Sequence, residues 1–266
     1  MTTTASTTMP NARERPVAPP SAGDFLDVDR LLSDEERMIR DTVRQFVRQD
    51  LLDRLPEAYA DGHLPDGLPE AAGRLGLLGM HLHGYGCPGT SAVAYGLACL
   101  ELEAGDSGIR SFVSVQGSLA MYALLRYGSE AQKRTWLPGM AAGNRIGCFG
   151  LNEPDAGSDP SNMRTTARFE DGHWVLSGTK MWITNGGIAD IAIVWAKTGD
   201  GIRGFVAPRG TDGLSARDIQ GKLSLRASTT SELVLAHCRL PEDALLPHAR
   251  AWEPPGRTAA NVTGLI

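Results

Sequence analysis

Two segments near the middle of the sequence combine a short apolar run with a few polar groups. The first reads Phe149-Gly-Leu-Asn-Glu-Pro-Asp-Ala-Gly-Ser158-Asp159, an apolar strand end and then a turn in which Gly157 can adopt a positive φ. Such a turn can direct backbone N–H groups and the Ser158 hydroxyl toward an anion or a ring edge. The second, Lys180-Met-Trp-Ile-Thr-Asn185, places the Trp182 ring beside the Thr184 hydroxyl on a strand-favouring stretch. A flat redox ring needs one apolar wall and a few fixed polar partners, and the two segments together supply both.

Each segment also has a purely structural interpretation. An Asp-Ala-Gly-Ser sequence is most often a solvated turn, and a tryptophan such as Trp182 is more often part of a core or a hairpin than of a cofactor site. The two segments in this order are far more specific than either one alone. We therefore interpret them together as half of a site for a planar redox cofactor.

Composition and charge exclude several classes of protein. The chain has 266 residues, of which 42% are hydrophobic, enough for a sizeable core and two domains. Its formal net charge of -5 provides no basic field for nucleic acid, and no apolar run is long enough to span a bilayer. The first residues lack the order of a secretory signal, so we expect a soluble, cytoplasmic protein. The four cysteines and the pair His81 and His83 lack metal-ligand spacing, and we expect reduced thiols and no metal site.

The first half of the chain is patterned as helices. Residues 1–23 are rich in Thr, Ser, Pro and Ala, and we expect them to form a disordered tail. Capping boxes of Ser33 with Glu36 and of Ser129 with Gln132 mark two helix starts. Apolar residues at helical spacing predict helices near residues 34–51, 69–78, 91–104, 107–126 and 129–142.

The pattern changes near Ile146. Short β-favouring runs follow at residues 165–169, 174–176, 180–184, 191–196, 202–207 and 232–238. Their spacing fits an antiparallel barrel or sandwich, and the lack of Gly-x-Gly-x-x-Gly after a strand argues against a Rossmann domain. The predicted fold class is α+β, with an N-terminal helical bundle domain at residues 24–145 and an antiparallel β-barrel or sandwich middle domain at residues 146–247.

These motifs resemble the acyl-CoA dehydrogenase family, closely and in register. The resemblance rests on Gly147-Cys-Phe-Gly-Leu-Asn-Glu-Pro-Asp-Ala-Gly-Ser-Asp159 and Leu176-Ser-Gly-Thr-Lys-Met-Trp-Ile-Thr-Asn185, and it covers about residues 24–247. Upstream, Ser107-Gly-Ile-Arg-Ser-Phe-Val-Ser-Val-Gln-Gly-Ser-Leu-Ala-Met121 is similar to the glutaryl-CoA dehydrogenase branch. The resemblance implies an extended FAD, bound between the helical N-terminal domain, the middle β domain and a C-terminal helical bundle.

The resemblance also implies site residues. Those that would contact the flavin are Phe149, Gly150, Leu151, Asn152, Gly157, Ser158, Trp182, Ile183 and Thr184, and those that would bind the acyl-CoA are Arg110, Ser111, Ser114 and Ser158. Asn152 replaces the more usual threonine of the family, so a side-chain contact there would change while backbone contacts survive. The fork of the Arg110 guanidinium matches the distal carboxylate of a dicarboxylic acyl-CoA. The alternative for Arg110 is an exposed arginine paired with a nearby acid.

The reaction that the resemblance implies is the FAD-dependent dehydrogenation and decarboxylation of glutaryl-CoA to crotonyl-CoA. A base removes a proton from the α carbon while a hydride leaves the β carbon for the flavin. Electrons would pass to an electron-transfer flavoprotein, and the family suggests a homotetramer. The alternatives are another short-chain acyl-CoA dehydrogenase and a non-catalytic fragment with residual flavin or acyl-CoA binding.

The family pattern stops after Pro247. Residues 248–266 show no helical periodicity, and a reading-frame shift near Pro247 is our hypothesis for this aberrant tail. We expect the C-terminal helical domain of the family, which supplies the catalytic glutamate, to be absent. The catalytic base is left unassigned, because Glu101 and Glu103 lie on a predicted helix and Glu153 belongs to the turn.

Overall fold

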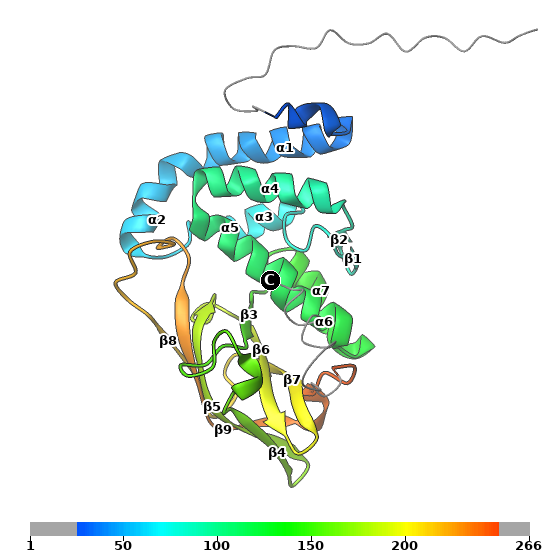
Figure 1. Ribbon diagram of the computed structural model, residues 1–266, viewed down its shortest axis with the longest axis vertical. Coiled ribbons are helices and arrows are strands. Elements are labelled where there is room, and N and C mark those ends of the chain that lie inside the picture. Colours follow the sequence, from blue (N-terminus) through cyan, green and yellow to red (C-terminus); the bar gives the residue numbers. More distant parts are fainter. Residues whose placement is uncertain (1–25, 250–266) are drawn as a thin grey trace, which may run out of the picture.

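The computed structural model describes residues 26–249, in which helices form one part of the molecule and a curled sheet forms the other (Figure 1). The helices come first in the chain, and the sheet begins at β3 (Gly147–Gly150). The expected order of the α+β fold is confirmed. The predicted tail at residues 1–23 lies outside the described residues, as does the C-terminal tail from residue 250 onward.

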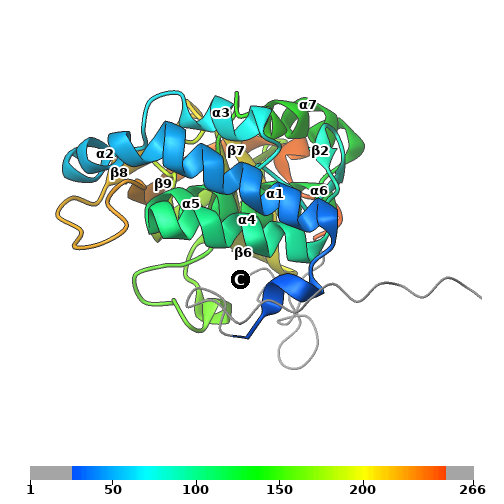
Figure 2. The same cartoon turned by 90° about the horizontal axis from the view of Figure 1, so that it is seen from above.

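Local sequence signals fix where several helices begin. Ser33 Oγ caps α1 (Asp34–Phe46) by accepting from Glu36 N at 3.2 Å, and the Glu36 carboxylate accepts from Ser33 N at 2.9 Å, so the predicted capping box is present. Ser129 and Gln132 form the second box at the start of α7 (Glu130–Ala141). Figure 2 shows α1 beside α4 (Ala92–Gly105). The other helical elements are η1 (Val28–Leu31), η2 (Val47–Leu51), η3 (Leu52–Arg54), α2 (Leu55–Asp61), α3 (Leu68–Arg74), α5 (Ser107–Ser114), η4 (Val115–Met121), α6 (Tyr122–Tyr127), η5 (Pro160–Asn162) and η6 (Glu242–Ala244).

The predicted helix at residues 107–126 is one continuous run that includes a π-helical segment, η4, between α5 and α6. The buried Gln116 of η4 donates from Nε2 to the carbonyl oxygens of Met140 at 3.2 Å and Arg145 at 2.8 Å. Its Oε1 accepts from Gly147 N at 2.7 Å. One side chain therefore joins η4 to the end of α7 and to the start of β3.

The sheet has seven strands in the described residues. The antiparallel neighbours are β4 (Thr166–Glu170), β5 (His173–Thr184), β9 (Thr230–Pro241) and β8 (Leu214–Asp218), and β7 (Gly201–Pro208) pairs antiparallel with β6 (Ile191–Thr198). The sheet is mostly antiparallel, as predicted, but β3 and β4 both pair in parallel with β6. Both strands can pair with β6 in this way because the loop at residues 151–165 returns the chain to the edge of β6 with which β3 pairs. A separate hairpin joins β1 (His83–Gly84) to β2 (Cys87–Pro88).

Strand β5 unites two stretches that the sequence predicts as separate strands. It pairs with β9 along its length, and the register shifts between Leu176 and Gly178 and again between Lys180 and Ile183. The second shift is a bulge that contains Trp182, whose φ is 62°. Bulges turn a side chain away from the direction that strict alternation would give it.

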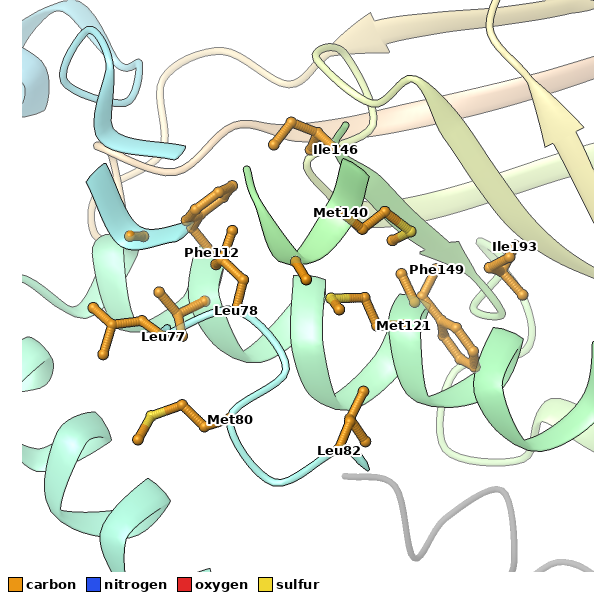
Figure 3. Close-up of a cluster of buried hydrophobic side chains, with 14 of the residues drawn as sticks. Leu77, Leu78, Met80, Leu82, Phe112, Met121, Met140, Ile146, Phe149 and Ile193 are labelled. Atoms are coloured by element: carbon orange, nitrogen blue, oxygen red, sulfur yellow. The ribbon is translucent and has the colours of Figure 1, made fainter. Parts of the chain in front are cut away.

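One apolar core is shared by the helices and the sheet. In Figure 3, Phe112, Met121 and Met140 of the helical part lie in the same buried cluster as Phe149 of β3 and Ile193 of β6. A second cluster, which includes Leu176, Phe205 and Leu235, packs within the curl of the sheet. Because the first cluster is continuous, the helices are fixed relative to β3, and residues on η4 reach the sheet at a defined position.

Gly117 allows η4 to approach the loop before β1 closely. A Cβ at Gly117 would lie 2.8 Å from Gly79 N. We expect Gly117→Ala to lower the free energy of unfolding by about 1–3 kcal/mol, the usual cost of overpacking. Gly96→Ala is the matched control, because a Cβ at Gly96 in α4 would meet no atom within 4 Å. That control should raise the free energy of unfolding by about 0.5–1 kcal/mol in urea titrations; two equal effects would contradict the close approach.

Candidate functional site

A cavity of about 150 Å³ lies where η4, the end of β3 and the end of β5 meet. Its lining consists of Val115, Leu119, Phe149, Leu151, Asn152, Trp182, Ile183 and Thr184. The last six belong to the two segments that the sequence singles out. The structure therefore brings both segments to one cavity, and η4 supplies the remaining wall.

The cavity has a largely apolar wall with one exposed aromatic ring. Phe149, Leu151 and Ile183 are buried, whereas Trp182 is 61% exposed. Trp182 is also held at positive φ by the bulge in β5, a strained conformation for an aromatic residue. An exposed tryptophan held under strain beside a cavity is typical of a residue that faces a ligand.

The same lining carries polar groups without partners. Neither the Thr184 hydroxyl nor the side-chain amide of Asn152 makes a hydrogen bond within residues 26–249, and the same holds for Asn152 N–H. The carbonyl oxygen of Asn152, in contrast, accepts from Met181 N at 2.9 Å. An apolar wall with unpaired donors fits a planar heteroaromatic ring such as a flavin.

The loop after β3 turns within the segment that the sequence predicts as a turn, at its first two residues. Glu153 and Ala156 exchange two backbone hydrogen bonds of 3.2 Å, so the chain reverses at Pro154 and Asp155. Gly157 lies after this reversal and is not in the left-handed region, so the positive φ that a glycine allows is not used there. A Cβ at Gly157 would meet no atom within 4 Å, and Ser158 is exposed.

Three of the predicted cofactor residues do not line the cavity. Gly157 and Ser158 lie on the exposed part of the loop. Gly150 is buried in β3, where a Cβ would lie 3.4 Å from Lys180 Cγ, so it lies against that lysine rather than in the cavity lining.

A buried ion pair joins the two segments. Lys180 is fully buried and Glu153 is 5% exposed, with Lys180 Nζ 2.8 Å from Glu153 Oε1. Lys180 Nζ also donates to the carbonyl oxygen of Leu151 at 3.0 Å. The Glu153 carboxylate accepts further hydrogen bonds from the backbone N–H groups of Arg164 and Thr165. The loop is thus bound to β5 from inside the protein.

Both members of this pair have shifted pKa values. Burial raises the pKa of Glu153, but hydrogen bonds from Arg164 N, Lys180 and Thr165 outweigh burial and hold the pKa below its usual value. Burial lowers the pKa of Lys180 to about 8, although Glu153 opposes the shift. The pair is therefore charged at neutral pH.

Arg110 lies on α5 in contact with both an acid and a serine. Its Nε donates to Glu103 Oε2 at 2.5 Å, and its Nη1 donates to Ser114 Oγ at 3.3 Å. Ser114 Oγ in turn donates to the carbonyl oxygen of Ser111 at 3.1 Å. Hydrogen bonds from Ser107 and Arg110 hold the pKa of Glu103 below its usual value. Nη2 of Arg110 has no partner among the described residues, so one edge of the guanidinium is available to a ligand.

Polar side chains follow Arg110 along the same helical run. Ser114 directly precedes Val115, which lines the cavity. Farther along, Ser118 Oγ lies 2.8 Å from the Tyr95 hydroxyl oxygen on α4. Burial raises the pKa of Tyr95 to about 12, so this phenol stays protonated. The helical run at residues 107–121 therefore carries both the guanidinium and part of the cavity wall.

Each of the three glutamates considered in the sequence is held in an ion pair. Glu101 binds the Arg44 guanidinium through both carboxylate oxygens, at 2.7 and 3.0 Å. Glu103 binds Arg110 and Glu153 binds Lys180. A carboxylate fixed in this way is poorly suited to remove a proton from a substrate.

Sequence reasoning missed three residues of the site. Val115 and Leu119 follow Ser111 at successive four-residue intervals, so helical spacing from the predicted substrate residue could have identified them. Lys180 was included in its motif, but nothing in its local sequence distinguishes a buried lysine from an exposed one.

Sequence comparisons agree with this geometry. Residues 33–144 match the acyl-CoA dehydrogenase, N-terminal domain, and residues 148–238 match the acyl-CoA dehydrogenase, middle domain. The chain belongs to the acyl-CoA dehydrogenase family. The predicted resemblance is confirmed.

Solved structures share the fold of this acyl-CoA dehydrogenase family chain. A glutaryl-CoA dehydrogenase from Mycobacterium smegmatis in complex with FADH2 is 60% identical, with a TM-score of 0.84 over 86% of this chain and 59% of that one. Butyryl-CoA dehydrogenase from Megasphaera elsdenii is 31% identical, with a TM-score of 0.76 over 82% of this chain and 60% of that one. The human mitochondrial short-chain specific acyl-CoA dehydrogenase is 36% identical over 221 residues, 81% of this chain. The chain spans 54% of the length of that human relative.

The low pKa of Glu153 predicts a specific dependence of stability on acid. A carboxyl whose pKa is lowered by folding stabilises the protein above its unfolded pKa of about 4.5 and loses this contribution as pH falls through the folded value. We expect Glu153→Gln to lower the free energy of unfolding by about 3–5 kcal/mol at neutral pH, because it leaves the buried Lys180 ammonium without its counter-charge. The difference from wild type should shrink below about pH 4.5 in denaturant titrations at several pH values.

The control for this prediction is Asp155→Asn in the same loop. Asp155 pairs with Arg164 at 3.2 Å, and both side chains are mostly exposed. An exposed pair contributes about 0–1 kcal/mol, so this variant should unfold almost as wild type does. A constant difference between wild type and Glu153→Gln across the acid range would contradict the assignment of the low pKa to Glu153.

Proposed function

We propose that this chain binds FAD and a dicarboxylic acyl-CoA in the manner of a glutaryl-CoA dehydrogenase, in the oxidation and decarboxylation of glutaryl-CoA to crotonyl-CoA. The observation that carries the proposal is the meeting of the two sequence segments at one cavity, with Arg110 on the helical run that supplies the opposite wall. The 60% identical relative is a glutaryl-CoA dehydrogenase described with FADH2, which supports both the cofactor and the substrate.

The residues around the cavity suit the flavin ring. Bound FAD would supply the chemistry of hydride acceptance from the acyl chain. Trp182 and Ile183 offer an apolar surface to the ring, while Asn152 N–H and the Thr184 hydroxyl offer hydrogen bonds. The exposed Gly157 and Ser158 would contact the parts of the cofactor and substrate that extend beyond the cavity.

Arg110 sets the proposed substrate class. Its guanidinium, positioned by Glu103 and Ser114, would bind the distal carboxylate of the acyl group. Ser111, the next residue of the helix, would also bind the substrate. Glu103 fixes the orientation of the guanidinium and leaves Nη2 for the substrate. Ser158 would approach the substrate from the loop of the middle domain.

The two domains have separate parts in this proposal. Residues 24–145 would form the domain that holds the acyl chain, and residues 146–247 the domain that holds the flavin. The electron acceptor would be an electron-transfer flavoprotein, and the assembly a homotetramer, as the family suggests.

The proposed location is the cytoplasm. In residues 26–249 the structure contains no helix with the length and apolarity of a membrane span. The human relative, in contrast, is a mitochondrial protein.

A second candidate is a short-chain acyl-CoA dehydrogenase that acts on unbranched monocarboxylic substrates. The 36% identity to the human short-chain specific enzyme favours it. In that case Arg110 would serve only to pair with Glu103. The two candidates share the cofactor and differ in the role of one side chain.

Flavin binding is tested by titrating the purified chain with FAD and following quenching of flavin fluorescence and the visible spectrum. We expect saturable binding, and Trp182→Ala should weaken it about twofold to tenfold through loss of ring contact. Phe169→Ala is the control, because Phe169 is also exposed but lies on β4 away from the cavity. Absence of binding by the wild-type chain, or equal loss in both variants, would contradict the proposed cofactor site.

Substrate class is tested with Arg110→Ala. Loss of a charge-assisted hydrogen bond to a carboxylate should weaken glutaryl-CoA binding about tenfold to a hundredfold and leave butyryl-CoA binding almost unchanged. Calorimetric titration of the FAD-loaded chain with both thioesters measures the ratio. Arg126→Ala, an exposed arginine on α6, is the control. An unchanged ratio in Arg110→Ala would favour the short-chain enzyme.

A further inference from the structure

We propose that Lys180 is a positioning residue for the cofactor, which holds the peptide between Leu151 and Asn152 so that Asn152 N–H is directed to the flavin. The inference rests on the proposed FAD site. It assigns a function to the buried ammonium group of Lys180, which the fold alone does not require. Lys180 touches neither the cavity nor the solvent, so its effect would pass through the loop.

The contacts of Lys180 lie on both sides of Asn152. Nζ donates to the carbonyl oxygen of Leu151 at 3.0 Å and to Glu153 Oε1 at 2.8 Å. The residue between these two partners, Asn152, lines the cavity. One ammonium group therefore forms hydrogen bonds with the residues immediately before and immediately after Asn152, the residue that lines the cavity.

These hydrogen bonds fix the direction of the Asn152 N–H through the geometry of the peptide bond. The described chain has no cis peptide, and in a trans peptide the C=O and N–H bonds point in opposite directions. Because the carbonyl of Leu151 points inward to Lys180, the N–H of Asn152 points away from Lys180. This N–H has no partner among the described residues, which leaves it available to an acceptor on a ligand in the cavity.

The next peptide is fixed as well. The carbonyl oxygen of Asn152 accepts from Met181 N at 2.9 Å, directly after Lys180 in the chain. Glu153 is held from its other side by Arg164 N and Thr165 N. Of the polar backbone groups of Asn152, only its N–H is left free.

A lysine here is not explained by stability alone. Burying an ion pair requires desolvation of both charges, and apolar residues of similar size often stabilise a protein as well or better. The charged pair does provide direction, because an ammonium group must be surrounded by acceptors and so selects the loop conformation in which the Leu151 carbonyl points inward. An apolar side chain would allow that peptide to rotate.

The test uses the double variant Lys180→Met with Glu153→Gln, which removes both charges and leaves no buried ion unpaired. We expect it to remain folded by circular dichroism and thermal unfolding, to bind FAD about threefold to tenfold more weakly than wild type, and to shift the visible band of bound flavin toward that of free FAD. Hydrogen exchange at residues 150–158 of the FAD-free chain should be faster, with β9 unchanged. A purely stabilising role would not move the flavin spectrum.

The control is Lys197→Met in β6 of the same sheet, whose side chain makes no hydrogen bond within the described range. It should bind FAD as wild type does. Unchanged FAD affinity and an unchanged spectrum in the double variant would overturn the inference while leaving the proposed function intact. Failure of the wild-type chain to bind FAD would overturn the proposed function and the inference with it.

If the double variant does not fold, Lys180→Met alone carries the test. It removes the donor to the Leu151 carbonyl and leaves the Glu153 carboxylate with its hydrogen bonds from Arg164 N and Thr165 N. FAD binding should weaken by a few fold. Equal affinity in Lys180→Met and wild type would then overturn the inference.

Discussion

The structure of the site depends on one buried contact, the ion pair between Lys180 in β5 and Glu153 in the loop after β3. The two segments are far from adjacent in sequence, and each is too short to hold its own shape. Lys180 fixes the loop through Leu151 and Glu153, and Met181 N fixes it through Asn152. The cavity exists because this contact holds the apolar end of β3 next to the bulge that exposes Trp182.

A second constraint places the helical wall. Gln116 binds Met140, Arg145 and Gly147, so η4 cannot slide along β3 without losing buried hydrogen bonds. The apolar core that the helices share with the sheet also holds η4 in place on β3. Since Arg110 lies on the same helical run, its distance from the cavity is set by the joint between helices and sheet. The proposed selection of substrate and the proposed binding of the cofactor are thus linked through packing.

Most of the fold could be predicted from the sequence because the signals are local. Ser33 and Ser129 mark helix starts with complete capping boxes, and the β-favouring runs correspond to strands of the sheet. The strand predictions failed where pairing between segments distant in sequence decides the structure. Two expected strands are one, because β9 spans both, and β3 and β4 pair in parallel with β6, which no local pattern reveals. Gly157 does not take a positive φ, because the loop closes by hydrogen bonds between Glu153 and Ala156.

The sequence by itself determined the family, the order of helices and strands, and the residue types of the candidate cofactor site, since motifs, caps and strand propensities are properties of short segments. The tertiary structure alone decided which of these residues meet. Phe149, Asn152 and Thr184 share a cavity with Val115 and Leu119, whereas Gly150 lies against Lys180. The tertiary structure also decided that Lys180 is buried and that it pairs with Glu153. Burial and contact are set by the packing of segments distant in sequence, which no single segment encodes.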